Sequence, residues 1–128
     1  MYDVIIIGGG PAAAGAAVYV ARKKLKTLLI AESFGGQSIV SADIHNWIGT
    51  KSISGIELAK NLEQHVRNYP EEVEVKTGEL AMRVLKEGDG FQVETNKGGS
   101  YKSKTVIMCA GARRRKLGIP GEEEFNGK

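Results

Sequence analysis

Residues 4–13 read Val-Ile-Ile-Ile-Gly-Gly-Gly-Pro-Ala-Ala, and this stretch decides the fold. Its β-branched start is typical of a strand buried on both faces of a parallel sheet. Gly8, Gly10 and Ala13 follow as G-x-G-x-x-A, and Pro11 stands where a helix can begin. The first glycine permits a tight turn, the second lets the backbone approach a pyrophosphate, and a small third residue lets helix and strand pack closely. The stretch therefore predicts a phosphate-binding turn whose helix offers free N–H groups to an anion.

An acidic residue stands where the sugar of a dinucleotide would lie. We expect a helix over Ala12–Lys24 and a strand over Thr27–Ile30, which complete a strand–helix–strand unit, and Glu32 follows that second strand. The separation is close to the roughly 20 residues at which an acid meets the ribose hydroxyls in such folds. A carboxylate there accepts hydrogen bonds from both hydroxyls and repels a 2′-phosphate, which disfavours NADP. The unit alone leaves FAD and NAD open as ligands.

The middle of the chain predicts a second helix and a third parallel strand. Residues 33–52 are expected to be irregular. Ser54 and Glu57 have capping-box spacing, so a helix should start at Ser54, and Pro70 marks its end. The run over Val73–Lys76 would then be the third parallel strand.

The last third of the chain predicts an antiparallel section. Period-two patterns indicate strands over Ala81–Lys86 and Phe91–Thr95 and a third strand around Tyr101. The apolar run Thr105–Cys109 predicts a return to the parallel sheet, and residues 118–128 read as an exit segment. The expected fold class is therefore α/β: a single Rossmann-like domain over residues 1–128, with a parallel sheet, helices on its faces and a three-stranded antiparallel β-meander.

Composition excludes several classes of protein. The formal net charge is only +3, and no aromatic residues interleave with the basic runs at 23–26 and 113–116, so we expect no nucleic-acid partner. Cys109 is the only cysteine, which rules out an internal disulfide or an all-cysteine metal site. Residues 4–21 carry no charge, but Gly8–Pro11 interrupts them, so we expect a cytoplasmic chain without a membrane partner.

Several motifs in the same order resemble one enzyme family. They are Gly-Gly-Gly-Pro-Ala at 8–12, Phe-Gly-Gly-Gln at 34–37, Asp-Ile-His-Asn-Trp at 43–47, Cys-Ala-Gly-Ala-Arg at 109–113 and Leu-Gly-Ile-Pro-Gly-Glu at 117–122. Together they resemble the amino-terminal FAD domain of thioredoxin reductases and of the flavoprotein component of alkyl hydroperoxide reductase, which are FAD-dependent pyridine nucleotide-disulfide oxidoreductases. The resemblance covers essentially the whole chain and selects FAD over NAD.

The resemblance also implies a set of FAD-binding residues. Gly8, Gly10, Pro11, Ala12 and Ala13 would cradle the pyrophosphate, Glu32 would bind the adenosine ribose, and Gly35, Gly36 and Gln37 would run beside the ribityl chain. Asn46 would approach the flavin, Met82 would offer its backbone to adenine, and Gly111 would let the chain pass close to the cofactor.

The chain departs from the family pattern at three places. Ala13 replaces a commoner glycine, His45 stands where glutamate is usual, and Cys109-Ala110 replaces Ala-Thr. Ala13 is tolerated because its methyl group is small. The role of the usual glutamate is in doubt here, and a hydroxyl that could bond the cofactor or the sheet is lost.

The resemblance further implies what the chain does not carry. In the family, an NADPH domain with a Cys-x-x-Cys pair begins after the position of residues 127–128, and a final segment then completes the FAD domain. The expected function is therefore the FAD-binding part of an NAD(P)H-dependent disulfide reductase, without catalytic residues or a metal, and inactive alone. Its expected partners are the NADPH domain, in the same parent chain or a partner chain, and a thioredoxin-like protein, with a homodimer when intact.

Two alternatives stay open at this point. The chain could be a non-catalytic dinucleotide-binding module, or the flavin domain of a ferredoxin–NADP reductase-like relative without the cysteine pair. The motifs at 34–37 and 118–122 favour the disulfide-reducing branch.

Overall fold

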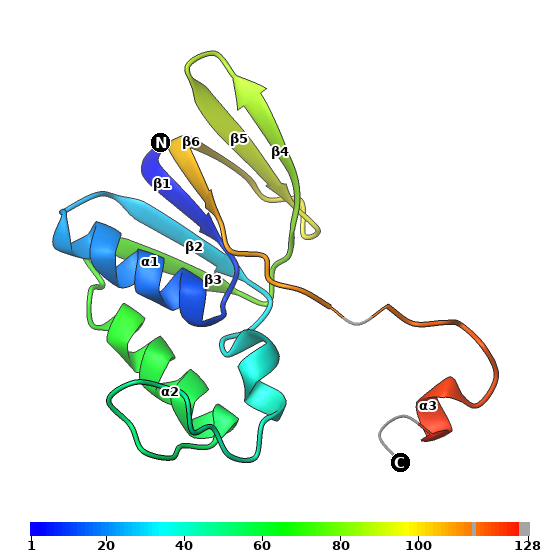
Figure 1. Ribbon diagram of the computed structural model, residues 1–128. Coiled ribbons are helices and arrows are strands. Elements are labelled where there is room, and N and C mark those ends of the chain that lie inside the picture. The colour runs from blue at the N-terminus through cyan, green and yellow to red at the C-terminus, as the bar shows by residue number, and fades with distance from the viewer. Residues whose placement is uncertain (114, 126–128) are drawn as a thin grey trace.

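A computed structural model describes residues 1–113 and 115–125. Arg114 of the basic run, and the end of the exit segment and of the expected domain at 126–128, lie outside the described residues. The elements are β1 (Tyr2–Ile7), α1 (Pro11–Arg22), β2 (Thr27–Ala31), the 3-10 helix η1 (Gly36–Val40), α2 (Gly55–Arg67), β3 (Val73–Thr77), β4 (Ala81–Glu87), β5 (Gly90–Thr95), β6 (Ser100–Met108) and α3 (Glu122–Phe125). They form one six-stranded sheet in the order β3-β2-β1-β6-β5-β4 (Figure 1).

The strand β1 is held on both sides and is the centre of the parallel half of the sheet. It pairs in parallel with β2 from Val4↔Thr27 to Ile7↔Ile30, and with β6 from Tyr2↔Ser103 to Ile7↔Met108. Its residues from Val4 to Ile7 are buried, as the continuous apolar run predicts. The position at which β1 ends is therefore fixed by neighbours on either side.

The helices α1 and α2 cover one face of the sheet. Small residues of α1 let it approach the strands closely, because Ala13, Ala14 and Ala17 are essentially fully buried in one cluster with β1 and β2. The helix α2 joins this cluster through Val66. Figure 1 shows α1 in front of the parallel strands and α2 beside α1. The helical cover that the sequence predicts is confirmed, and in the described part of the chain both long helices lie on the same face.

One of the two hydrogen bonds of the capping box predicted for α2 is confirmed. The Ser54 side chain accepts a hydrogen bond from the backbone N–H of Glu57 at 3.2 Å, which satisfies one of the free donors at the start of the helix. The helix ends at Arg67, shortly before Pro70, as that proline indicates.

The opposite face of the sheet is covered by the meander. Ile5, Ile7, Leu28 and Ile30 form a second cluster with Val93 of β5, and Tyr2, Ala81, Tyr101 and Val106 pack against it. The antiparallel strands thus replace a helical layer on this side. The parallel strands are therefore packed on both of their faces.

One expected boundary in the meander is wrong. The sequence predicts a strand around Tyr101 and a separate one over Thr105–Cys109, whereas the structure has the single strand β6 over Ser100–Met108. Its two edges serve different partners: β5 pairs with it antiparallel from Phe91↔Ser103 to Glu94↔Ser100, and β1 pairs with it in parallel. No glycine or proline interrupts these residues, so the strand continues from the meander into the parallel half. The sheet is mixed for this reason.

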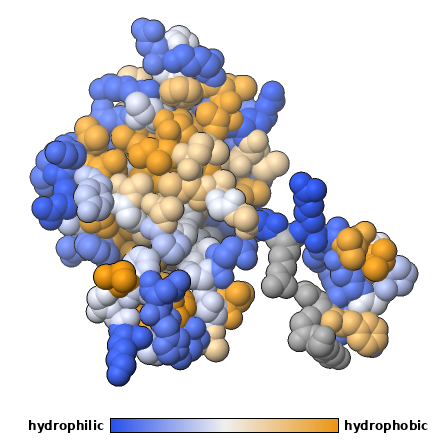
Figure 2. All heavy atoms as spheres, in the orientation of Figure 1, coloured by the Kyte–Doolittle hydropathy of each residue, from blue (hydrophilic) through white to orange (hydrophobic). Residues whose placement is uncertain are grey.

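The exit segment leaves the body of the domain and carries a short helix, α3, that the sequence does not predict (Figure 1). The carboxylate of Glu122 accepts hydrogen bonds from the backbone N–H groups of Leu117 and Gly118, both at 2.7 Å. Figure 2 shows apolar side chains on this segment, where Leu117 and Ile119 are exposed.

Substitution of the turn glycine Gly8 and of the helix glycine Gly15 should change the free energy of unfolding in opposite directions. Gly8 has φ +127°, and a Cβ on it would lie 2.2 Å from the Cys109 carbonyl oxygen, whereas a Cβ on Gly15 would meet nothing within 4 Å. We expect Gly15→Ala to raise the free energy of unfolding by roughly 0.5–1 kcal/mol, because alanine costs less entropy in a helix. Gly8→Ala should lower it or prevent folding. Urea denaturation of the two variants checks this; a stable Gly8→Ala chain would contradict the assigned turn.

A second prediction concerns alkaline pH. The Tyr2 hydroxyl donates to Glu74 at 2.5 Å, and burial together with that carboxylate raises the pKa of Tyr2 from 10.0 to about 12. Folding therefore favours the neutral phenol, and this stabilisation is complete below pH 10 and is lost as the pH rises towards 12. A Tyr2→Phe variant cannot ionise, so its free energy of unfolding should fall less steeply than wild type across this interval. Parallel pH curves for the two proteins would rule this origin out.

Candidate functional site

The glycine turn after β1 holds two glycines that packing requires and one that it does not. A Cβ on Gly8 would overlap the Cys109 carbonyl oxygen, and a Cβ on Gly9 would lie 2.0 Å from the Ser33 carbonyl oxygen. A Cβ on Gly10 would approach only the Gly36 Cα, at 3.7 Å. Packing therefore requires glycine at positions 8 and 9, whereas at position 10 a Cβ would make only an ordinary van der Waals contact.

The helix α1 begins at this turn without a side-chain cap. Gly10 is its N-cap residue, Pro11 follows at the first helical position, and its first turn holds no acidic residue. Ala14 is the first residue whose N–H finds the intrahelical acceptor, the Gly10 carbonyl at 3.0 Å. The N–H groups of Ala12 and Ala13 precede this bond and have no acceptor within the helix. Free amides and the positive end of the helix dipole together can hold an anion.

A second glycine pair lies directly against the first. The Gly35 N–H donates to the Gly9 carbonyl at 2.8 Å, and a Cβ on Gly36 would lie 3.1 Å from the Gly10 Cα. Gly35 and Gly36 have φ values of +107° and +56°, in the left-handed region that favours glycine. The 3-10 helix η1 starts here, in a stretch that the sequence predicts to be irregular. The structure thus brings the two predicted segments together.

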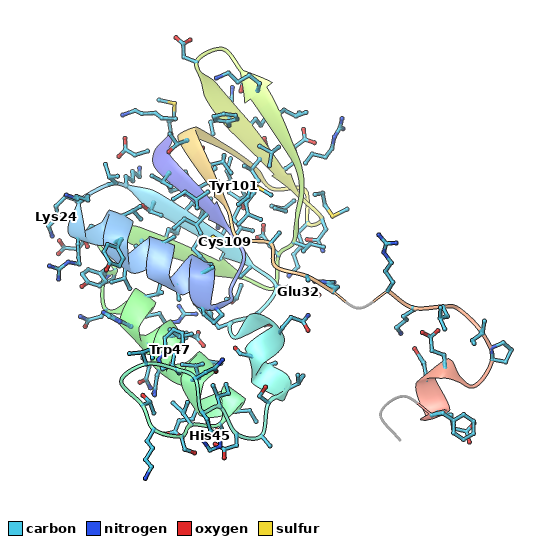
Figure 3. All side chains as sticks on the ribbon, viewed as in Figure 1. Lys24, Glu32, His45, Trp47, Tyr101 and Cys109 are labelled. Atoms are coloured by element: carbon cyan, nitrogen blue, oxygen red, sulfur yellow. The ribbon has the colours of Figure 1, made fainter. Side chains whose placement is uncertain are left out.

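The tip of β2 meets the segment that follows β6. The guanidinium of Arg113 forms an ion pair with the Glu32 carboxylate, and Gln37 Nε2 donates to the Ala112 carbonyl oxygen at 2.6 Å. Gly111, with φ +63°, lies in the same exposed segment. Figure 3 shows Glu32 beside this segment. The predicted residues Glu32, Gln37 and Gly111 are thereby gathered at one end of the sheet.

Sequence reasoning misses two residues at this end. The G-x-G pattern treats Gly9 as a variable position, although its contact with Ser33 excludes any side chain. Arg113 is not among the predicted site residues, whereas the structure pairs it with Glu32. The signal for this pair is the positive charge of Arg113 at the end of the motif at 109–113, opposite in sign to Glu32.

Met82 lies at an irregular position of the edge strand. The register of β4 against β5 shifts between Ala81 and Arg83, so Met82 falls in a β-bulge, and its side chain is exposed. A bulged residue is left unpaired in the ladder. The turn between β3 and β4 lies at the tip of β2, because the Gly78 N–H donates to the Glu32 carbonyl at 3.0 Å.

Asn46 lies on a different part of the surface. It is exposed on the loop that joins η1 to α2, which is closed by a bridge between Ile44 and Ile53. Figure 3 shows its neighbours His45 and Trp47 beside α2, well apart from Glu32. The structure therefore does not bring Asn46 to the glycine turns, and any shared ligand would have to be long.

His45, which stands in place of a usual glutamate, has a local partner. Its Nε2 lies 2.7 Å from Asp43 Oδ2, and the Ser52 hydroxyl donates to Asp43 Oδ1 at 2.5 Å. The Ser52 hydrogen bond, together with His45, lowers the pKa of Asp43. These contacts hold the two sides of the loop together.

The thiol of Cys109 is partly buried. Burial raises the pKa of the Cys109 thiol, which favours its unreactive form. No group of three or more histidine, cysteine or acidic residues able to hold a metal occurs among residues 1–113 and 115–125. No helix within those ranges is long and apolar enough to cross a membrane.

Comparison with known proteins identifies the family. The sequence profile of the pyridine nucleotide-disulphide oxidoreductases matches residues 2–128. The chain is 45% identical over 127 residues to an NADH dehydrogenase of Bacillus subtilis, covering 99% of this chain and 24% of the relative. It is 42% identical over 130 residues to alkyl hydroperoxide reductase F of Pseudomonas aeruginosa, covering 99% of this chain and 25% of that protein.

The fold agrees with this relationship. Thioredoxin reductase of Lactococcus lactis superimposes with a TM-score of 0.87 at 37% identity, over 98% of this chain and 40% of that one. The chain thus spans about a quarter of the length of the curated relatives, and its Rossmann-like α/β fold is that of the amino-terminal portion of thioredoxin reductases. The chain belongs to the pyridine nucleotide-disulphide oxidoreductase family.

Proposed function

We propose that this chain is the FAD-binding part of an NAD(P)H-dependent disulfide reductase resembling thioredoxin reductase, and that residues 1–128 form that domain. The observation that carries the proposal is the uncapped start of α1 beside Gly10 and Gly36. Family membership supports a flavin as the ligand. When bound, FAD supplies the capacity to accept a hydride and pass its two electrons onward.

The diphosphate of FAD fits the amino-terminal end, or mouth, of α1. The N–H groups of Ala12 and Ala13 would donate to its oxygens, as neutral donors backed by the helix dipole. Gly10 and Gly36 would let the backbone approach the diphosphate, since neither carries a side chain and a Cβ on Gly10 would meet only the Gly36 Cα. Gly8, Pro11 and Ala13 would shape the turn from behind. The cradle is built of backbone, so it needs small residues rather than charged ones.

The adenosine half fits the tip of β2. Glu32 would accept hydrogen bonds from the ribose hydroxyls, because its side chain is exposed at the end of the strand. Met82 would offer unpaired backbone groups of its bulge to adenine. The link from Glu32 to Gly78 supports this placement, since it brings the start of β4 towards the sugar.

The flavin half would extend in the opposite direction. Gly35, Gly36 and Gln37 would run beside the ribityl chain, and Gly111 would let the segment after β6 pass close to it. Asn46 would then approach the flavin from the loop before α2. A dinucleotide as long as FAD suits residues that lie this far apart, and a mononucleotide does not.

The complete reaction needs groups that these residues do not include. Reduction of a disulfide by exchange requires two thiols, and the chain has one cysteine, which is partly buried. We therefore assign the Cys-x-x-Cys pair and the NADPH site to an NADPH domain outside this chain, in the same parent chain or in a partner. A thioredoxin-like protein would accept the electrons, the intact enzyme would be a cytoplasmic homodimer, and this chain alone would be inactive.

A Gly10→Ala variant should weaken FAD binding without affecting folding. The backbone of Gly10 has φ −79°, which alanine adopts, and its Cβ would touch only the Gly36 Cα at 3.7 Å. The variant should therefore fold normally, while its methyl group fills space that the diphosphate needs. We expect FAD affinity, measured by quenching of flavin fluorescence, to fall by roughly tenfold or more, the factor for about 1.4 kcal/mol.

Gly15→Ala is the matched control, because it adds the same methyl group to the same helix away from its mouth. It should bind FAD as wild type does. A wild-type chain that fails to bind added FAD would reject the proposed function. Equal affinity of the Gly10→Ala and wild-type chains would remove the mouth of α1 from the site.

A further inference from the structure

The segment after β6 crosses the end of the central strand. Cys109 makes the last sheet hydrogen bond, from its N–H to the Ile7 carbonyl at 2.8 Å. The strand β6 lies on one side of β1 and β2 lies on the other. Arg113 nevertheless reaches Glu32, which follows β2. Residues 110–113 therefore pass over the end of β1, next to the glycine turn.

The Glu32 carboxylate, which pairs with Arg113, can accept a further hydrogen bond. Arg113 contacts the Oε2 atom of Glu32, and among residues 1–113 and 115–125 no other hydrogen bond occupies the Oε1 atom, which is available as an acceptor. The two side chains are 68% and 58% exposed, and pairs at that exposure contribute little to stability. The pair is thus better suited to orienting the carboxylate than to holding the fold.

The negative charge of Glu32 favours a cation as its neighbour in the proposed site. A ligand with a diphosphate at the mouth of α1 brings negative charge close to the carboxylate that must bind its sugar. The repulsion between the two opposes binding unless a cation offsets it. The guanidinium of Arg113 is a cation that offers several donors in a fixed plane.

From this geometry we propose that Arg113 is a positioning residue of the nucleotide site: its guanidinium holds one oxygen of Glu32 and thereby directs the other to the ribose hydroxyls. The inference rests on the proposed function and deepens it, because it concerns the adenosine end of the same site. Arg113 acts through Glu32 and does not itself bind the diphosphate.

The test compares ADP with 2′-deoxy-ADP by isothermal titration calorimetry on the chain. We expect Arg113→Ala to weaken ADP binding roughly fivefold, the factor for about 1 kcal/mol, and 2′-deoxy-ADP binding by less. In a Glu32→Gln background the Arg113→Ala effect should largely vanish, and Arg113→Lys should restore part of the affinity. Because the pair is exposed, the thermal midpoint of Arg113→Ala should match wild type.

Arg115→Ala is the matched control, since it removes one positive charge from the same basic run. If Arg113→Ala weakens ADP no more than Arg115→Ala does, the positioning role is wrong while the proposed function stands. An equal loss for both nucleotides that persists with Glu32→Gln would assign Arg113 to the diphosphate and overturn the proposal. A wild-type chain that binds neither nucleotide would overturn the proposed function and this inference together.

Discussion

The pairing of β1 on both edges is the constraint on which the rest of the site depends. With β2 on one side and β6 on the other, the end of β1 cannot shift, and the chain has to leave the sheet between two occupied neighbours. Only glycine fits that exit, because a Cβ on Gly8 or Gly9 would overlap neighbouring carbonyl groups. The start of α1 is consequently fixed relative to the tips of β2 and β6. Packing of the core thus determines where free helix amides are presented.

The segments that sequence could predict are those whose patterns are local. The apolar run of β1, the small residues of α1 and the Ser54 cap of α2 each depend on neighbours within a few residues, and all three agree with the structure. The position of Glu32 at a strand tip also follows from a motif with fixed spacing, whereas the second glycine pair is expected at the site only through the family resemblance. These features place the candidate site at one end of the sheet.

The features that sequence could not predict depend on distant partners. That β6 is one strand follows from its two different edges, of which β5 takes one and β1 the other. The pairing of Arg113 with Glu32 depends on a crossing that no local pattern encodes. The short helix η1 escapes prediction because its turn begins with two glycines in the left-handed region, which sequence rules read as loop.

In the proposed site, free amides at the start of α1 hold the diphosphate of a nucleotide. Amide chemical shifts of the isotope-labelled chain, recorded while ADP is added, test this contact. We expect the signals of Ala12 and Ala13 to move most, together with that of Gly36 opposite them. Unchanged signals from Ala12 and Ala13, in a titration where other residues respond, would contradict it.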